Sequence, residues 1–309
     1  MVSNSICLAV DLFLLTVCVL QILVNFLVLY VWITHRKLRR NDNLILLVSL
    51  AFIDFAYAVL HLPYLVILIK GWKPNYQDFN YDPWLILTVG APSAALMKSG
   101  CTVTTAIAID RVAAVYIPVT WCTGAFVFSL LMALLDWIVV QATVDIVPKP
   151  KCPSFGCFVS KTFRVYWGLS NMVVNLLSCI LTLIIIYHLF QGPFNEEIRN
   201  IERLNKAKID SNANRVALYI LLVSALIGVV PGCLNAVGTI VQIPILDEIS
   251  FFVGTCATLS GLSHAFIFAM AHREIKAVIR NFLGMDKPQP MEPSAPNTSV
   301  PVKNIFHNS

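Results

Sequence analysis

Several charged or polar side chains stand within long apolar runs of this sequence. Asp110 and Arg111 are adjacent at the end of one run, Asp54 follows Leu50-Ala51 in another, and Asn25 lies in a third. An ionisable group in an apolar surrounding is costly unless it is paired, so these residues are functional candidates. The chemistry open to them is ion pairing and hydrogen bonding that differs between two states of the protein.

Catalytic motifs are absent from the sequence. It contains no His-Glu-x-x-His, no phosphate-binding glycine loop and no Gly-x-Ser-x-Gly. His61, His188 and His264 are isolated and lack the spacing of metal ligands. We therefore expect a protein that is not an enzyme and that uses no cofactor and no metal.

The elements that position these residues are apolar segments. Of the 309 residues 58% are hydrophobic, the mean hydropathy is +0.76, and only 13% are charged. A bilayer core takes about 20 helical residues to cross. Seven runs are long enough: Ile6–Thr34, Leu44–Ile69, Trp84–Ile117, Thr123–Val147, Val165–Phe190, Val216–Ile240 and Ile249–Ala271. The prediction is an all-α membrane protein, a seven-transmembrane helix bundle over residues 1–272 in contact with membrane lipids.

The distribution of basic residues predicts the orientation. With the N-terminus outside, 15 of the 22 Lys and Arg residues fall in inner loops and the tail, six in outer loops, and Lys98 within a helix. This bias is typical of a multi-pass plasma-membrane protein with a cytoplasmic C-terminus. No basic stripe or aromatic platform indicates a nucleic-acid partner. Residues 1–5 carry no basic side chain, so we expect no cleavable signal peptide.

Two further segments follow the last run. Residues 273–284 place apolar side chains at helical spacings of three and four, with basic residues elsewhere on the wheel, which predicts an amphipathic helix in the membrane interface. Residues 285–309 are rich in Pro, Ser and Asn and are predicted to form a disordered cytoplasmic tail.

The order of these motifs resembles that of rhodopsin-like G-protein-coupled receptors. That family has an Asn in its first helix, Leu-Ala-x-x-Asp in its second, an acidic residue followed by Arg-Tyr at the inner end of its third and a Trp in its fourth. The matching residues here are Asn25, Leu50 to Asp54, Asp110-Arg111 and Trp137. The resemblance implies a polar network at Asn25 and Asp54 and a switch at Asp110 and Arg111.

The second half of the chain departs from that pattern. Tyr187 and Pro231 fall near a Tyr and a Pro of the family's fifth and sixth helices. The family's Asn-Pro-x-x-Tyr appears here as His264 to Phe268. By resemblance, Tyr187, Pro231, His264 and Phe268 join the switch that opens a cytoplasmic groove to a heterotrimeric G protein.

This drift, the short N-terminus and the loop CPSFGC are similar to the nematode serpentine chemoreceptors, nearest to the class called BC. The resemblance implies a chemosensory receptor, located in the plasma membrane or sensory cilia, that binds a small-molecule ligand in the outer half of the bundle. The ligand-pocket candidates are Lys98, Cys101, Cys233 and Asn235. A neuropeptide or amine receptor and a transporter-like, non-signalling bundle remain alternatives.

Two pairings are expected among the remaining polar residues. Ile86 stands where the family has its third-helix cysteine, so we expect a disulfide between Cys152 and Cys157, with Cys7 as the competing partner of either. Lys98 lies deep in the third run, where an unpaired ammonium is costly, so we hypothesise a structural pair with Asp136 over a ligand-binding role.

Overall fold

The computed structural model describes residues 4–39, 44–75, 78–116, 122–144, 146–150, 152, 154–191, 216–229, 249–271 and 273–282. All regular secondary structure in these ranges is helical. The elements are α1 (Asn4–Thr34), α2 (Arg36–Arg39), α3 (Ile45–Lys70), α4 (Pro83–Tyr116), α5 (Cys122–Thr143), α6 (Phe155–Phe158), α7 (Lys161–Gln191), the π-helical turn η4 (Ala225–Val229), α10 (Ile249–Ala271) and α11 (Arg273–Phe282). Residues 216–224 form a helix that leads directly into η4.

Six helices, α1, α3, α4, α5, α7 and α10, follow six of the predicted runs within a few residues. The largest difference at a C-terminal end is in the fourth run, where α5 ends at Thr143 and the prediction extended to Val147. Pro148 follows, and a proline disfavours helical geometry in the residue before it. Of the sixth predicted run, residues 216–229 are described and the rest lies outside the described residues, as does the predicted tail.

Five described helices are long and apolar enough to cross a membrane, and they are α1, α3, α5, α7 and α10. The longest helix, α4, is more polar because it contains Lys98, Asp110 and Arg111 as well as several threonines. Large apolar side chains such as Leu23, Val173 and Leu183 are more than half exposed. Extended apolar surface of this kind suits contact with lipid, and the chain is a multi-pass membrane protein.

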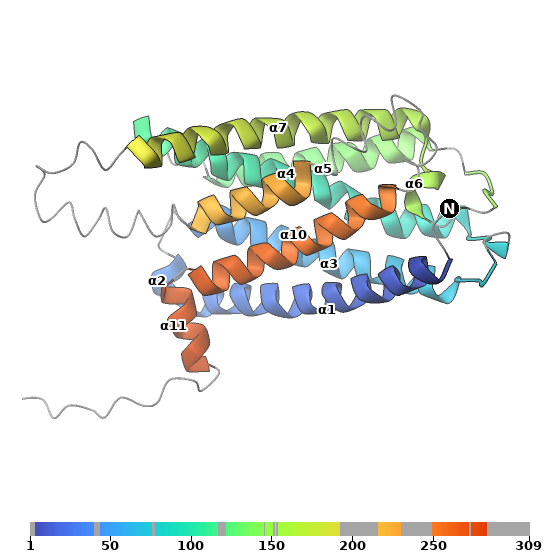
Figure 1. Cartoon of the computed structure of the whole chain (residues 1–309), viewed down its shortest axis with the longest axis horizontal. Helices are drawn as coiled ribbons and strands as arrows, with labels where there is room; N and C mark the ends of the chain where they lie inside the picture. The colour runs from blue at the N-terminus through green and yellow to red at the C-terminus, as the bar shows by residue number, and fades with distance from the viewer. Residues whose placement is uncertain are drawn as a thin grey trace, which may run out of the picture.

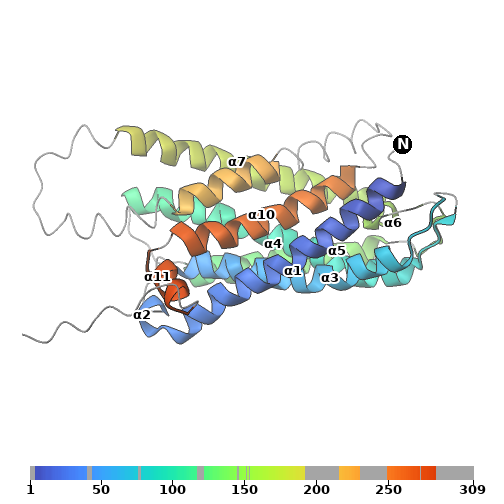
Figure 2. The same cartoon turned by 60° about the horizontal axis from the view of Figure 1, so that its bottom comes forward.

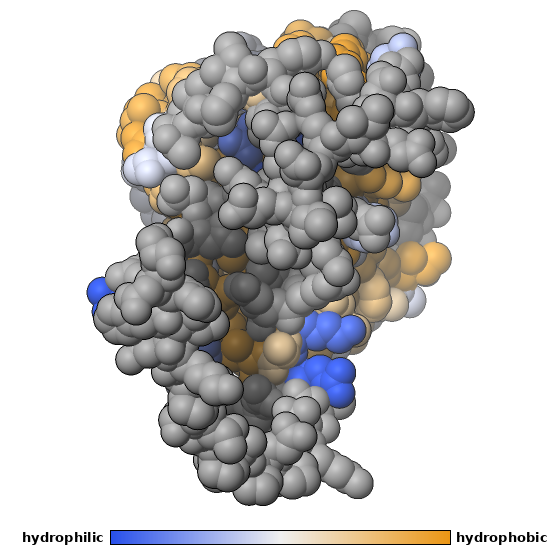
Figure 3. All heavy atoms as spheres, turned by 90° about the vertical axis from the view of Figure 1, so that its left-hand side faces the viewer, coloured by the Kyte–Doolittle hydropathy of each residue, from blue (hydrophilic) through white to orange (hydrophobic). Residues whose placement is uncertain are grey.

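The long helices run side by side along one axis (Figures 1 and 2). The start of α1 and the short helix α6 lie at one end of the bundle, and α2 and α11 lie at the other. We call these the α6 end and the α11 end. Hydrophilic side chains of the described residues show at the α11 end, with apolar side chains along its flanks (Figure 3). α11 has its apolar Ile275 fully buried against the bundle.

The described part of the interior contains two apolar clusters with a polar layer between them. On α1 the cluster towards the α6 end includes Cys18, and the cluster towards the α11 end begins at Val28. The same gap occurs on α3 between Ile53 and Ala58, and on α4 between Ala91 and Val103. The buried polar side chains of this layer include Gln21, Asn25, Asp54, Lys98, Ser99 and Thr102. The sequence thus places its polar residues at one level of three successive helices.

Candidate functional site: two cavities and a buried polar layer

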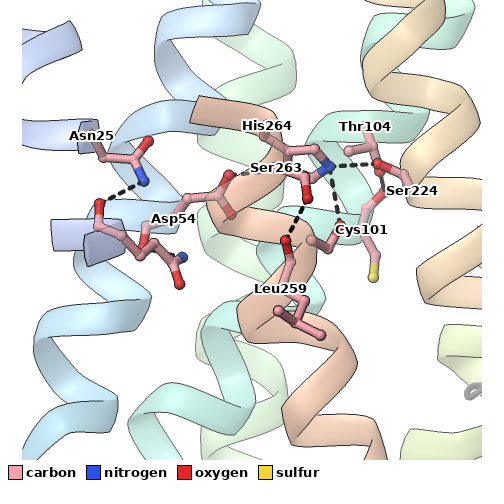
Figure 4. A network of polar contacts seen from close by, with 10 residues as sticks. Asn25, Asp54, Cys101, Thr104, Ser224, Leu259, Ser263 and His264 are labelled. Carbon is pink, nitrogen blue, oxygen red and sulfur yellow. Dashed lines mark hydrogen bonds and ion pairs between the residues drawn. The ribbon is translucent and has the colours of Figure 1, made fainter. Parts of the chain in front are cut away.

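Asp54 and His264 form the central contact of the polar layer. Asp54 Oδ2 on α3 and His264 Nδ1 on α10 are 3.0 Å apart, and both side chains are buried (Figure 4). On its other side His264 Nε2 lies 2.8 Å from Ser224 Oγ and 3.1 Å from Ser260 Oγ. The imidazole therefore connects α3, α10 and the helix that precedes η4.

Either charge state of His264 satisfies these contacts. A neutral ring with its proton on Nδ1 donates to Asp54 and accepts a serine O–H at Nε2. A doubly protonated ring forms an ion pair with Asp54 and donates to a serine. Because Ser224 directly precedes the π-helical turn, the contact ends where the backbone leaves α-helical geometry. Such turns are frequent at functional positions.

The α1 side of the layer is formed by amides. Gln21 Nε2 donates to the carbonyl oxygen of Asp54 at 2.9 Å, and Asn25 Nδ2 donates to the carbonyl oxygen of Gln21 at 3.0 Å. Gly261 on α10 leaves the space that the Gln21 amide occupies, since a Cβ at this position would overlap Gln21 Nε2. The predicted network residues Asn25 and Asp54 thus lie in one layer, joined through Gln21.

The order Asp54, His264, Ser224 is also the order of a hydrolase triad. A triad needs free N–H donors for the developing oxyanion. Ser224 and Ser260 both lie within helices, where backbone N–H groups bond within the helix. The contacts therefore fit a polar connection between helices better than acyl transfer. Within the described residues no group of three His, Cys, Asp or Glu side chains could hold a metal ion.

A cavity of about 110 Å³, the end cavity, lies towards the α6 end. One wall is an aromatic stripe on α3 made of Tyr57, His61 and Tyr64, with the His61 ring centroid 5.1 Å from that of Tyr57 and 5.3 Å from that of Tyr64. The lining also includes Asp11 on α1, Phe155 of α6, and Arg164 and Trp167 on α7.

A second cavity of about 90 Å³, the central cavity, adjoins the polar layer. Its lining includes Asp54, Ser224, Ser260 and His264, and Cys101, one of the predicted pocket residues. Four residues line both cavities: Tyr57, Met97, Trp167 and Val253. A molecule in the end cavity would therefore touch side chains that also border the Asp54–His264 contact.

Lys98 lines neither cavity. Its Nζ donates to Ser170 Oγ and, at 3.4 Å, to Asn171 Oδ1, both on α7. The hypothesised Lys98–Asp136 pair is not within ion-pair distance in the described residues, and Asp136 Oδ1 accepts the Tyr166 O–H at 2.8 Å. The two charges still interact electrostatically, and α7 supplies the hydrogen-bond partner of each.

The residues of the predicted switch are spread along the α11 half of the bundle. Arg111 Nη2 and Asp110 Oδ2 are 3.4 Å apart, with the guanidinium buried. Phe268 is fully buried in the apolar cluster of that end, and Tyr187 is exposed. Pro231, Cys233 and Asn235 lie outside the described residues.

The loop before α7 covers the end cavity. The structure joins Cys152 to Cys157 by a disulfide, and Phe155 N–H donates to Tyr64 Oη at 2.9 Å. The Phe155 ring lies so close to Gly90 on α4 that a Cβ there would be 2.7 Å from it. Ile86, which stands where the family has its third-helix cysteine, belongs to the same apolar cluster as Cys152. The residue at this position therefore contributes apolar packing here.

Sequence reasoning missed three features of the site. It treated His264 as an isolated histidine outside the polar layer, it did not group Tyr57, His61 and Tyr64, and it did not consider Asp11. The spacing of four and three residues on α3 could have revealed the stripe. Asp11 could have been found as an acidic residue inside the first apolar run.

Comparison with known families agrees with these observations. The family model described as serpentine type 7TM GPCR chemoreceptor Srbc matches residues 3–258. The match includes Asn25, Asp54 and the Asp110–Arg111 pair and ends before His264. No curated protein matches the chain.

Proposed function

Because the chain belongs to the Srbc family of serpentine 7TM GPCR chemoreceptors, we propose that it binds a small molecule in the end cavity and thereby activates a heterotrimeric G protein. The predicted resemblance to class BC is confirmed by the family match. As a member of a chemoreceptor family, the chain is a receptor in the membrane.

The observation that carries the proposal is the shared wall of the two cavities. Tyr57 lines both, and its O–H contacts Thr258 Oγ1 on α10 at 3.2 Å. Trp167 brings α7 to the same boundary. A ligand that moves Tyr57 or Trp167 alters the spacing of α3, α7 and α10 around the Asp54–His264 contact. Binding energy can thus shift an equilibrium between two bundle arrangements.

The Asp110–Arg111 pair is the proposed switch between the two bundle arrangements. In the proposed resting state Arg111 is held by its neighbour, and in the active state it is released as the sixth span moves outward to open a groove. We place that groove at the α11 end, on the cytoplasmic side, with Tyr187, Pro231, His264 and Phe268 contributing to the motion.

The topology belongs to the same proposal. Seven spans, including α4 and a sixth span that starts at Val216, would cross the plasma membrane over residues 1–272. The N-terminus and the α6 end would face outside. α11, within residues 273–284, would lie in the membrane interface, and residues 285–309 would form the cytoplasmic tail. Sensory cilia are the proposed site of action.

Signalling by an Arg111 variant tests the proposal. Cells expressing the full chain are screened with small volatile and water-soluble compounds, using calcium or cyclic-nucleotide readouts. Arg111→Ala should reach the surface and abolish ligand-evoked signalling, whereas Arg39→Ala, at an exposed position of α2, should leave it intact. Normal signalling by Arg111→Ala would contradict the switch. Ligand uptake without a G-protein response would favour a transporter.

A further inference from the structure

Asp11 is a buried carboxyl group without a partner on the wall of the end cavity. Its side chain extends from α1, lines the cavity and is 6% exposed. Its Oδ1 atom is enclosed and has no hydrogen-bond partner. Among the described residues, Asp11 forms no ion pair.

An unpaired carboxylate in such a place lowers stability. Removing it from water without a compensating contact is costly, and a membrane interior adds to that cost. The other buried acidic groups show what compensation looks like, since Asp54 has His264 and Asp136 has the Tyr166 O–H. Asp11 lacks an equivalent contact and faces a cavity, which is the position of a group that a ligand completes.

The aromatic side chains that line the cavity suit a positive charge. The Tyr57 O–H is engaged with Thr258, and the Tyr64 Oη accepts the Phe155 N–H. Tyr57, Tyr64, Trp167 and Phe155 all line the cavity, so aromatic rings make up much of its wall. Aromatic faces attract ammonium groups, with Trp and Tyr the strongest.

The size of the cavity limits the ligand. Its volume of about 110 Å³ is below the ~150 Å³ of an engineered protein cavity that accommodates benzene. A molecule of a few non-hydrogen atoms fits within this volume. Arg164 on α7 also lines the cavity, so we assign the positive group to the side of Asp11 on α1.

We propose that the end cavity recognises a small organic amine as its ammonium ion, with Asp11 as the counter-ion and the rings of Tyr57 and Tyr64 beside it. This inference rests on the proposed receptor function, because it names the chemical class of that receptor's ligand. An amine receptor requires a carboxylate, and in this proposal Asp11 provides it from α1.

Thermal denaturation of the purified full chain in lipid nanodiscs gives the first test. Without ligand, Asp11→Asn should be at least as stable as the wild type, because it removes an uncompensated charge. Isobutylamine or cyclopentylamine should stabilise the wild type and Asp11→Glu, and should not stabilise Asp11→Asn. Isobutanol, cyclopentanol and isobutyric acid should have little effect. The matched control is Asp136→Asn, which removes a buried carboxylate that lines neither cavity and should keep the amine response.

Signalling with the same compounds separates this inference from the proposed function. Asp11→Asn should lose on the order of 30-fold or more in amine potency, the effect of removing one partner of a buried charge pair. Neutral compounds that act equally on the wild type and on Asp11→Asn would overturn the amine assignment while the receptor function stands. Amine stabilisation that depends on Asp11 without any G-protein response would support the assignment and contradict the receptor function. Amines that neither stabilise nor activate would overturn the assignment.

Discussion

At the scale of single residues, Asp54 and His264 compensate each other. Both side chains are buried, and each needs a charged or strongly polar partner. Each has the other as that partner, at 3.0 Å between Asp54 Oδ2 and His264 Nδ1. Replacing one of them leaves the other uncompensated, at a cost of roughly 1–3 kcal/mol for a buried polar group and more for a charge.

We therefore predict that His264→Leu lowers the free energy of unfolding by more than the loss of one hydrogen bond. The double variant Asp54→Leu with His264→Leu should recover part of that loss, because neither partner is left alone. Thermal denaturation of the wild type, both single variants and the double variant provides the cycle. Additive effects of the two substitutions would show that the pair is not coupled.

The residue scale is also where the sequence was least informative. Asp54 and His264 are 210 positions apart, and no local pattern predicts which distant helix faces Asp54. The partner of Lys98 was misjudged for the same reason. α4 packs against α7 as well as α5, and sequence adjacency favoured α5.

At the scale of elements, helix ends were predictable because a membrane interior leaves the backbone few options. Apolar length alone predicted α1, α3 and α10 within two residues at each end. The face that each helix presents to its neighbours was not predictable in this way, because nearly every position of these helices is apolar. The helical period of hydrophobicity therefore says little about which face of such a segment is buried.

The contact between α1 and α10 depends on Gly261, which has no side chain and so leaves room for the Gln21 amide. Gly261→Ala would displace the Gln21 amide and break its hydrogen bond to the Asp54 carbonyl, a loss of about 1 kcal/mol. Alanine also favours a helix over glycine by about 1 kcal/mol. We predict that these effects cancel, leaving Gly261→Ala no more stable than the wild type in thermal denaturation.

Gly124→Ala on α5 is the matched control for that prediction, since a Cβ there meets no atom within 4 Å. It should stabilise the protein by the helix-propensity gain. Equal stabilisation by both substitutions would mean that Gln21 moves aside without cost. Combining Gly261→Ala with Gln21→Ala should restore the gain that Gly124→Ala shows.

At the scale of the whole molecule, the polar layer divides the apolar interior into two halves. The end cavity lies in one half and the Asp110–Arg111 pair in the other, with the central cavity and His264 between them. Helices joined through a few polar contacts between two well-packed clusters can shift without separating the clusters. This arrangement suits a receptor in which ligand binding at one end changes the conformation of the other end.

The proposed orientation is tested by labelling. An epitope tag after Ser3 should be detected on intact cells, and a tag after Asn304 only after permeabilisation. The expectation follows from the excess of Lys and Arg at the α11 end and in the predicted tail. Detection of the C-terminal tag on intact cells would reverse the topology and remove the cytoplasmic groove from the proposal.

The loop over the end cavity is attached by contacts that a reductant cannot cleave. Phe155 is anchored through the Tyr64 hydroxyl and packs against Gly90, while Lys149 Nζ donates to the carbonyl oxygen of Cys157. The Cys152–Cys157 bond joins two residues of the segment between α5 and α7, the second of them in α6, so its reduction cuts no covalent link to the long helices. If the end cavity is the ligand site, as proposed, these contacts should keep Phe155 in place when the bond is reduced, so ligand recognition should survive a mild reductant.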